Sequence, residues 1–170
     1  MKKNGHEAHT PASPTMTESH YRQLGLMVAL SFIAMYILMY VMVNSLDNVV
    51  TNFNQAYMAG LMAAPMVLIE LAVMRSMYRS RRLNAIFAAS ALALAIASFV
   101  LIRQQVAIGD RQFLRSMIPH HAGAILMCQR AALTSAEIKE LCERPDGIVA
   151  SQQAEIAQMK AWLDRGIAGR

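Results

Sequence analysis

The chain has 170 residues, of which 55% are apolar and 16% are charged. A mean hydropathy of +0.30 is high for a soluble protein, so we expect membrane-spanning segments. The net charge of +5 comes largely from arginines beside apolar runs, which favours membrane orientation and predicts no nucleic-acid partner.

Residues 1–22 are predicted to be a disordered cytoplasmic tail. They contain Pro11, Pro14 and several Ser and Thr residues, and they show no hydrophobic period.

Residues 23–103 are predicted to form three membrane-spanning helices, at 24–43, 56–74 and 83–102. Each apolar run is long enough to cross a bilayer of about 30 Å at about 1.5 Å per residue. Glu70 lies near the end of the second run, where we expect it to pair with Arg75 or to reach the head groups. In the third run, small residues recur at four-residue steps, which favours close approach by another helix: Ala89, Ala93 and Ala97.

Charge sets the predicted orientation of these helices. The loop after the second helix carries four arginines, and the positive-inside rule places it in the cytoplasm: Arg75, Arg79, Arg81 and Arg82. The link between the first two helices has no Lys or Arg. Three spans therefore place residues 104–170 outside the cytoplasm, with membrane lipid as a partner.

Methionines recur along the first two predicted helices, as Met35, Met39 and Met42 and as Met58, Met62 and Met66. Such rows could pass copper(I) through the membrane, which makes a transport protein one alternative. Methionine is also a common filler of packed surfaces, and packing is the usual role of such a row.

Residues 104–170 are predicted to form an extracytoplasmic domain of three helices, so the whole chain is expected to be all-α. Apolar spacing predicts helices over about 111–132 and 148–165. Thr134 and Glu137 have capping-box spacing and predict the start of a helix between these two. Pro145 and Gly147 predict its end.

Soft donors gather on the first of these helices. Met117 and His121 are four residues apart, and His120 and Met127 are seven apart, so they lie on one side of a helix. Thioethers and imidazoles suit copper(I) or silver(I) better than magnesium or calcium. On the last helix, Glu155 and Met159 could complete the metal shell. The alternative is that the methionines fill the core, the histidines lie on an exposed face, and Glu155 is a surface carboxylate.

Two cysteines lie at similar distances on either side of the turn near Thr134. In an antiparallel hairpin this places Cys128 and Cys142 level with each other, as a disulfide requires. An oxidising compartment favours the bridge. Reduced cysteines could instead bind Cu(I) as thiolates.

These residues carry a family resemblance. The patterns Met117-Ile-Pro-His120-His121 with Met127, Glu137-Ile-Lys with Cys142, and Ser151-Gln152 with Glu155 and Met159 resemble the bacterial domain of unknown function 305 family. The resemblance covers about the last 60 residues of the sequence. It implies a ferritin-like helical domain, like that of periplasmic copper-binding proteins of the CopM type, on a bacterial inner membrane. Arg144-Pro145-Asp146 departs from the family pattern as a short break between the last two helices.

The sequence thus predicts a membrane-anchored, periplasm-facing protein that binds a copper ion for sequestration, tolerance or hand-over. The small outer domain buries little by itself, so we expect it to dimerise into a four-helix bundle or to pack on the membrane face. A structural protein whose His-Met face is a helix contact is the other alternative. We expect no enzyme, because no catalytic motif is present.

Overall fold

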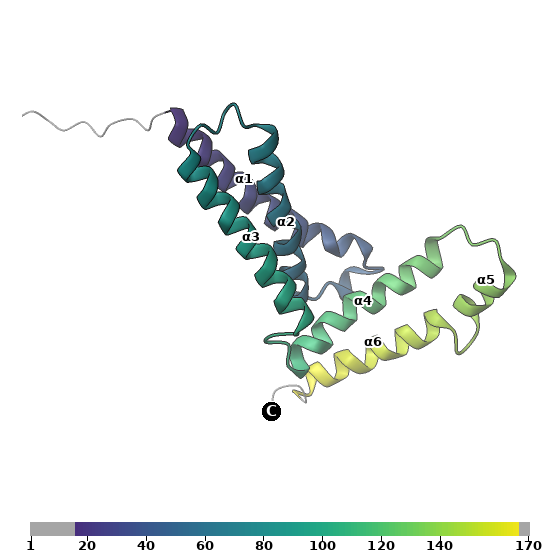
Figure 1. Cartoon of the computed structure of the whole chain (residues 1–170). Coiled ribbons are helices and arrows are strands. Elements are labelled where there is room, and N and C mark those ends of the chain that lie inside the picture. The colour runs from purple at the N-terminus through teal and green to yellow at the C-terminus, as the bar shows by residue number, and fades with distance from the viewer. Residues whose placement is uncertain (1–15, 167–170) are drawn as a thin grey trace, which may run out of the picture.

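The computed structural model describes residues 16–166, and every regular element in that range is helical. The elements in chain order are α1 (Met16–Leu38), η1 (Met39–Met42), η2 (Leu46–Asn48), α2 (Phe53–Val73), α3 (Arg81–Arg103), α4 (Asp110–Arg130), α5 (Ala136–Glu143) and α6 (Ile148–Asp164). Helices α1–α3 form one bundle, and α4 and α6 lie side by side at an angle to it (Figure 1). The all-α prediction is confirmed.

The first helix begins earlier than the sequence predicted. Residues 16–22 were assigned to the tail, but α1 starts at Met16. The polar residues of this first segment precede an apolar run, and Tyr21 and Leu24 are buried there against Tyr78. This packing extends the helix beyond the apolar run. The predicted disorder of residues 1–15 lies outside the described residues.

Three helical segments are long and apolar enough to cross a membrane: Ser19–Met42, Phe53–Val73 and Arg81–Arg103. Helix α2 packs against both of its neighbours and buries small residues, Ala59, Ala63 and Ala64 among them. A Cβ atom on Gly60 would lie 2.8 Å from Oγ of Ser98, so a larger residue there would require the Ser98 side chain to turn away from α2. The bundle buries small residues, whereas large apolar side chains such as Leu30 and Ile37 of α1 are exposed on its surface.

The small residues of α3 that contact α2 are not the predicted ones. Ala89, Ala93 and Ala97 are exposed within the chain. Ala91 and Ser98 are buried in their place. Both sets of small residues recur at a helical spacing, so each lies along one face of α3. Spacing alone could not show which of the two faces packs against α2.

Glu70 contacts Tyr78, a partner that the sequence did not suggest. Its Oε1 atom accepts a hydrogen bond from the hydroxyl of Tyr78 at 3.2 Å, in place of a pair with Arg75. Burial raises the pKa of Tyr78, and the neighbouring Glu70 carboxylate raises it further. Tyr21 donates to Oδ1 of Asn84 at 2.6 Å and ties α1 to α3 at the same end of the bundle.

The connection from α3 to α4 is tight. Gln105 and Ala107 both have positive φ, at 49° and 59°, a left-handed conformation that disfavours residues with a Cβ. Hydrogen bonds of the Gln105 side chain offset the cost of this conformation. The side chain donates to the carbonyl of Ile102 at 2.7 Å and pairs with the side chain of Asn54 at the start of α2. This turn fixes the direction in which α4 leaves the bundle.

Helices α4–α6, which we call the outer unit, have a core of apolar side chains between α4 and α6: Leu114, Ile118, Ala122, Ile125, Ile156 and Met159. The sequence offered two ways to cover such a small core, a second copy of the chain or the membrane face. Val43 and Val50 of the link between α1 and α2 pack against it, so the link supplies part of the cover. The homodimer stays a prediction.

Helix α5 and its ends follow the sequence only in part. The predicted capping box is wrong, because the N-cap is Ser135 rather than Thr134, and it makes no side-chain capping bond. The predicted break after α5 is present between Glu143 and Ile148. There, a Cβ on Gly147 would lie 2.7 Å from the carbonyl oxygen of Leu141, so this turn requires glycine.

Candidate metal-binding site

Helix α4 carries most of the predicted ligands and has two different faces. It runs from Asp110 to Arg130 without interruption, and Pro119 lies buried inside it. Successive residues of an α-helix are about 100° apart, from 3.6 residues per turn. His120 and His121 therefore leave the helix in different directions, with ring centroids 6.1 Å apart and planes at 64°.

His121 belongs to the face that packs on α6. Its Nε2 atom lies 2.6 Å from Oε2 of Glu155, and its Nδ1 atom lies 2.9 Å from the carbonyl oxygen of Met117. Both ring nitrogens of His121 thus face oxygen atoms of the protein. In this arrangement His121 is a contact between helices.

His120 belongs to a different face of α4, which lines a pocket. It lines a pocket of about 490 Å³ between α4, η1 and the start of α2. Met117, Pro119, Gly123, Ala124 and Met127 line the pocket from the same helix. Both predicted thioethers of α4 therefore share a pocket with one of the two predicted imidazoles.

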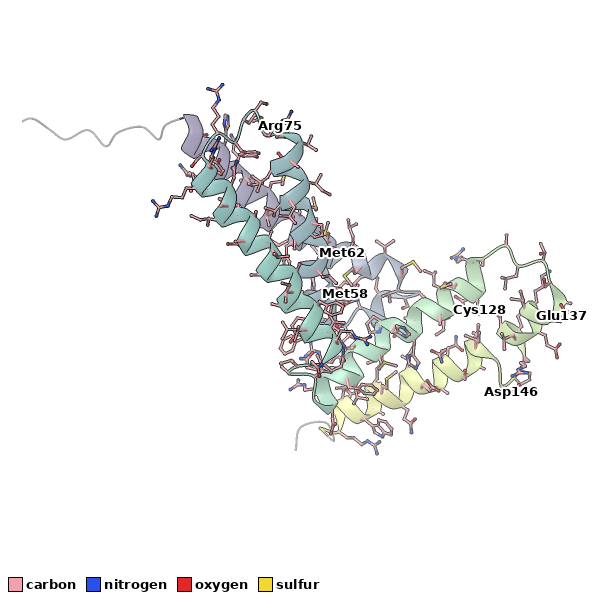
Figure 2. The ribbon with its side chains drawn as sticks, viewed as in Figure 1. Met58, Met62, Arg75, Cys128, Glu137 and Asp146 are labelled. Carbon is pink, nitrogen blue, oxygen red and sulfur yellow. A yellow bond between two sulfur atoms is a disulfide. The ribbon has the colours of Figure 1, made fainter. Side chains whose placement is uncertain are left out.

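The bundle supplies the other wall of this pocket. Met39 and Met42 line it from η1, and Met58 lines it from α2, together with the polar side chains of Asn52, Asn54 and Gln55. Met58 lies on α2 one turn before Met62, which does not line the pocket (Figure 2). The sequence placed these methionines in rows along two helices and did not connect them with α4.

Polar contacts hold α4 against the bundle beside the pocket. Asn54 donates to Oγ of Ser116 at 3.2 Å. The guanidinium of Arg115 donates to the carbonyl and the hydroxyl oxygens of Thr51, at 2.8 and 2.7 Å. A Cβ on Gly123 would lie 3.5 Å from the carbonyl oxygen of Met42, so α4 and η1 approach closely there.

The six predicted metal ligands are thus divided between two places. Met117, His120 and Met127 line the pocket, whereas His121 and Glu155 bind each other across α4 and α6. Met159 is 6% exposed and packs in the outer core. The structure does not bring all six residues together in one place, because adjacent residues such as His120 and His121 leave a helix about 100° apart.

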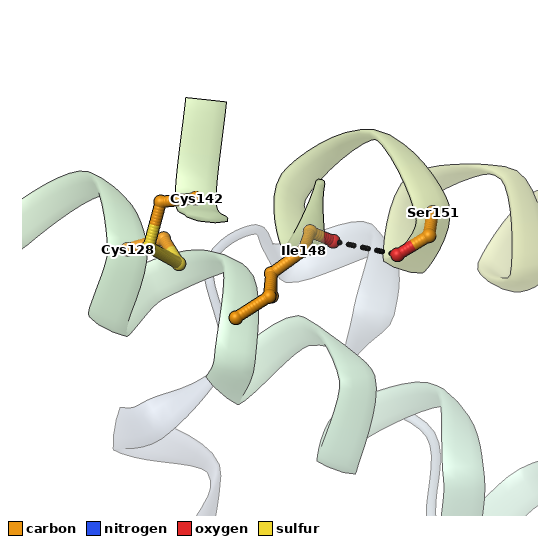
Figure 3. Close-up of a disulfide and its surroundings, with 4 residues drawn as sticks. All are labelled: Cys128, Cys142, Ile148 and Ser151. Atoms are coloured by element: carbon orange, nitrogen blue, oxygen red, sulfur yellow. Dashed lines mark hydrogen bonds between the residues drawn. A yellow bond between two sulfur atoms is a disulfide. The ribbon is translucent and has the colours of Figure 1, made fainter. Parts of the chain in front are cut away.

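Cys128 and Cys142 are joined by a disulfide, with their Cα atoms 5.6 Å apart (Figure 3). The hairpin between α4 and α5 brings them level, as expected. Cys142 is the buried residue of α5, so the bridge is the main anchor of this short helix. As cystine sulfurs, these atoms are not thiolate ligands for a metal.

Within residues 16–166, no group of three or more His, Cys, Asp or Glu side chains is placed to hold a metal ion. Sites for zinc or for hard cations are usually built from such groups. The pocket beside His120 has a different donor set, with thioethers in the majority. Thioethers and an imidazole fit a soft ion such as Cu(I), so the chemistry of the donors is compatible with the predicted copper ion.

The fold and this pocket define an all-helical protein with three helices long enough to cross a membrane and an outer helical pair packed on one end of them. The chain belongs to the family described as domain of unknown function (DUF305), which matches residues 54–163. The match extends beyond the last 60 residues that carried the resemblance and includes α2 and α3.

One curated relative is an uncharacterised protein of Acanthamoeba polyphaga mimivirus. It is 32% identical to this chain over 142 residues, which are 82% of the chain and 90% of the relative. The similarity therefore spans both the bundle and the outer helices. No solved structure matches the chain.

Proposed function

We propose that this protein is a membrane-anchored, periplasm-facing binder of soft metal ions, Cu(I) or Ag(I), which it sequesters or hands on. The observation that carries the proposal is the shared position of Met117, His120 and Met127. These three side chains come from one face of α4 and line a single pocket at the end of the bundle.

The chemistry of these donors supports a soft monovalent ion. Thioether sulfur is uncharged and polarisable, and it selects Cu(I) among biological metals. An exposed imidazole adds one nitrogen donor. No Asp or Glu lines the pocket, so a cation of higher charge would find no compensating carboxylate there.

Titration of the purified full-length protein with Ag(I), in detergent and without added thiols, tests this proposal. We expect binding that weakens at least tenfold when Met117→Leu, His120→Ala and Met127→Leu are combined. A matched control combines His20→Ala, Met74→Leu and Met77→Leu, which changes the same residue types at the other end of the bundle. Wild-type affinity in the pocket variant would refute the proposal.

The proposed orientation places α4–α6 outside the cytoplasm. The start of α1 and the arginine-bearing loop after Met74 lie together at the end of the bundle away from α4–α6 (Figures 1 and 2). By the positive-inside rule that end faces the cytoplasm. The disulfide supports the same assignment, because such bonds persist in oxidising compartments. A C-terminal alkaline phosphatase fusion should be active, and a C-terminal fluorescent fusion that folds only in the cytoplasm should be dark. The reverse result would refute the orientation.

A structural role is the better assignment for the other face of α4. The His121–Glu155 contact at 2.6 Å joins α4 to α6, as a helix contact would. Substitution of His121 is therefore expected to weaken metal binding only through the stability of the outer unit.

A further inference from the structure

We infer that Met39, Met42 and Met58 are metal ligands, so that a bound soft ion joins the outer helix α4 to the membrane bundle. The inference rests on the proposed function and deepens it, because it assigns the second wall of the same pocket. The ligands would then come from η1 and α2 of the bundle as well as from α4.

The first support is the composition of the pocket. Three thioethers of η1 and α2 line it opposite the two thioethers and the imidazole of α4. Five sulfur donors and one nitrogen donor line about 490 Å³, and η1 and α2 supply three of the five sulfurs.

The second support is the exposure of these methionines, which separates them from core filler. Met159, a core methionine, is 6% exposed, whereas Met42, Met58 and Met127 are 52%, 37% and 59% exposed. A thioether that only fills a gap is enclosed by its neighbours. Met62, outside the pocket, is 47% exposed, so what selects Met42, Met58 and Met127 is that they also line the pocket.

The third support is the contact that fixes the two walls relative to each other. The Arg115–Thr51 hydrogen bonds link α4 to the residues just before α2, and the Asn54–Ser116 hydrogen bond links α4 to the first turn of α2. The backbone N–H of Phe53 also donates to Oε1 of Gln112 at 3.2 Å. The donors on both walls are thus held near one another before a metal binds, which lowers the entropy cost of binding.

Ag(I) titration of the full-length protein in detergent tests the assignment. The test variant combines Met39→Leu, Met42→Leu and Met58→Leu, changes that nearly conserve volume. The control variant combines Met35→Leu, Met62→Leu and Met66→Leu, which lie in the same two rows but do not line the pocket. We expect at least a tenfold loss of Ag(I) affinity in the test variant and less than a twofold change in the control.

A second measurement uses the wild type only, so its result does not depend on the stability of any variant. In the wild type labelled with methyl-¹³C methionine, Ag(I) should shift the methyl signals assigned to Met39, Met42 and Met58 together with those of Met117 and Met127. Those of Met35, Met62 and Met66 should not move.

Three outcomes would overturn the inference. Wild-type affinity in the test variant, combined with loss in the α4 variant, would overturn it and leave the proposed function standing. Equal weakening in the test and control variants would show that the effect is not specific to the pocket. Absence of Ag(I) binding by the wild type would overturn both proposals.

Discussion

The two faces of helix α4 differ in what they bury and in how their polar groups are used. The face toward α6 buries Ile118, Ala122 and Ile125, and its His121 contacts Glu155 of α6 and the carbonyl oxygen of Met117 in α4 itself. The face toward η1 and α2 carries His120 and Met127, both exposed, beside a pocket. Two adjacent histidines thus have different environments on one helix, so a His-His pair in a sequence does not by itself define one site.

The largest expected effect is on the α6 face. Ile118 is fully buried, and its replacement by Ala should lower the free energy of unfolding of the outer unit by about 2–5 kcal/mol. Trp162, the only tryptophan, packs against the same core and reports its unfolding by fluorescence. Met127→Ala, on the pocket face, should change this free energy by less than about 0.5 kcal/mol. Equal destabilisation by the two variants would contradict the conclusion that only the α6 face is part of the packed core.

The disulfide is expected to have the next largest effect. Replacing Cys128 and Cys142 by Ser removes the closure of a loop with a sequence separation of 14, which is worth about 3 kcal/mol in the chain-entropy description. Since the rest of α5 is exposed, amide hydrogen exchange should become fast in α5 and stay slow in the middle of α6. Unchanged protection of α5 would mean that other contacts hold it.

The two histidines should separate stability from metal binding. His121→Ala removes the contact with Glu155 and should cost about 1–2 kcal/mol of unfolding free energy, because that carboxylate is half exposed and keeps its hydration. His120→Ala should change unfolding by less than about 0.5 kcal/mol and should weaken Ag(I) binding instead. Thermal unfolding and Ag(I) titration of both variants check this, and loss of Ag(I) binding with unchanged stability in His121→Ala would reverse our assignment.

The smallest expected effect is at Gly123, on the pocket face. An alanine Cβ would be in ordinary contact with the carbonyl oxygen of Met42 at 3.5 Å. Gly123→Ala should therefore stabilise α4 by up to about 1 kcal/mol through helix propensity, with Ag(I) affinity kept. Gly123→Leu should push η1 away and weaken Ag(I) binding. Strong destabilisation by the alanine would show that α4 and η1 are closer than described.

Much of the fold was predictable because hydropathy and turn residues act locally. The apolar runs gave the three long helices to within a few residues at most ends, and Pro145 with Gly147 marked the break before α6. The level positions of Cys128 and Cys142 followed from counting along a hairpin. The start of α1 was missed because it depends on the packing of Tyr21 against Tyr78.

Only the α4 wall of the candidate site was predictable from the sequence. Met117, His120 and Met127 were found because they share a helix, and residues on one helix are related by a fixed period. His121 was grouped with them because spacing alone does not show what each face contacts. The contribution of Met39, Met42 and Met58 depends on how η1 and α2 lie against α4, for which the sequence has no local signal.

The sequence by itself determined that this protein is all-α, that three helices are apolar enough to cross a membrane, and that soft donors gather on one outer helix. These properties follow from composition and helical period, which each segment carries independently of the others. The tertiary structure alone decided which imidazole faces the pocket, which binds Glu155, and which methionines of the bundle meet α4. Those choices depend on contacts between segments far apart in the chain, and they follow from the angle at which the turn after α3 directs the outer helices.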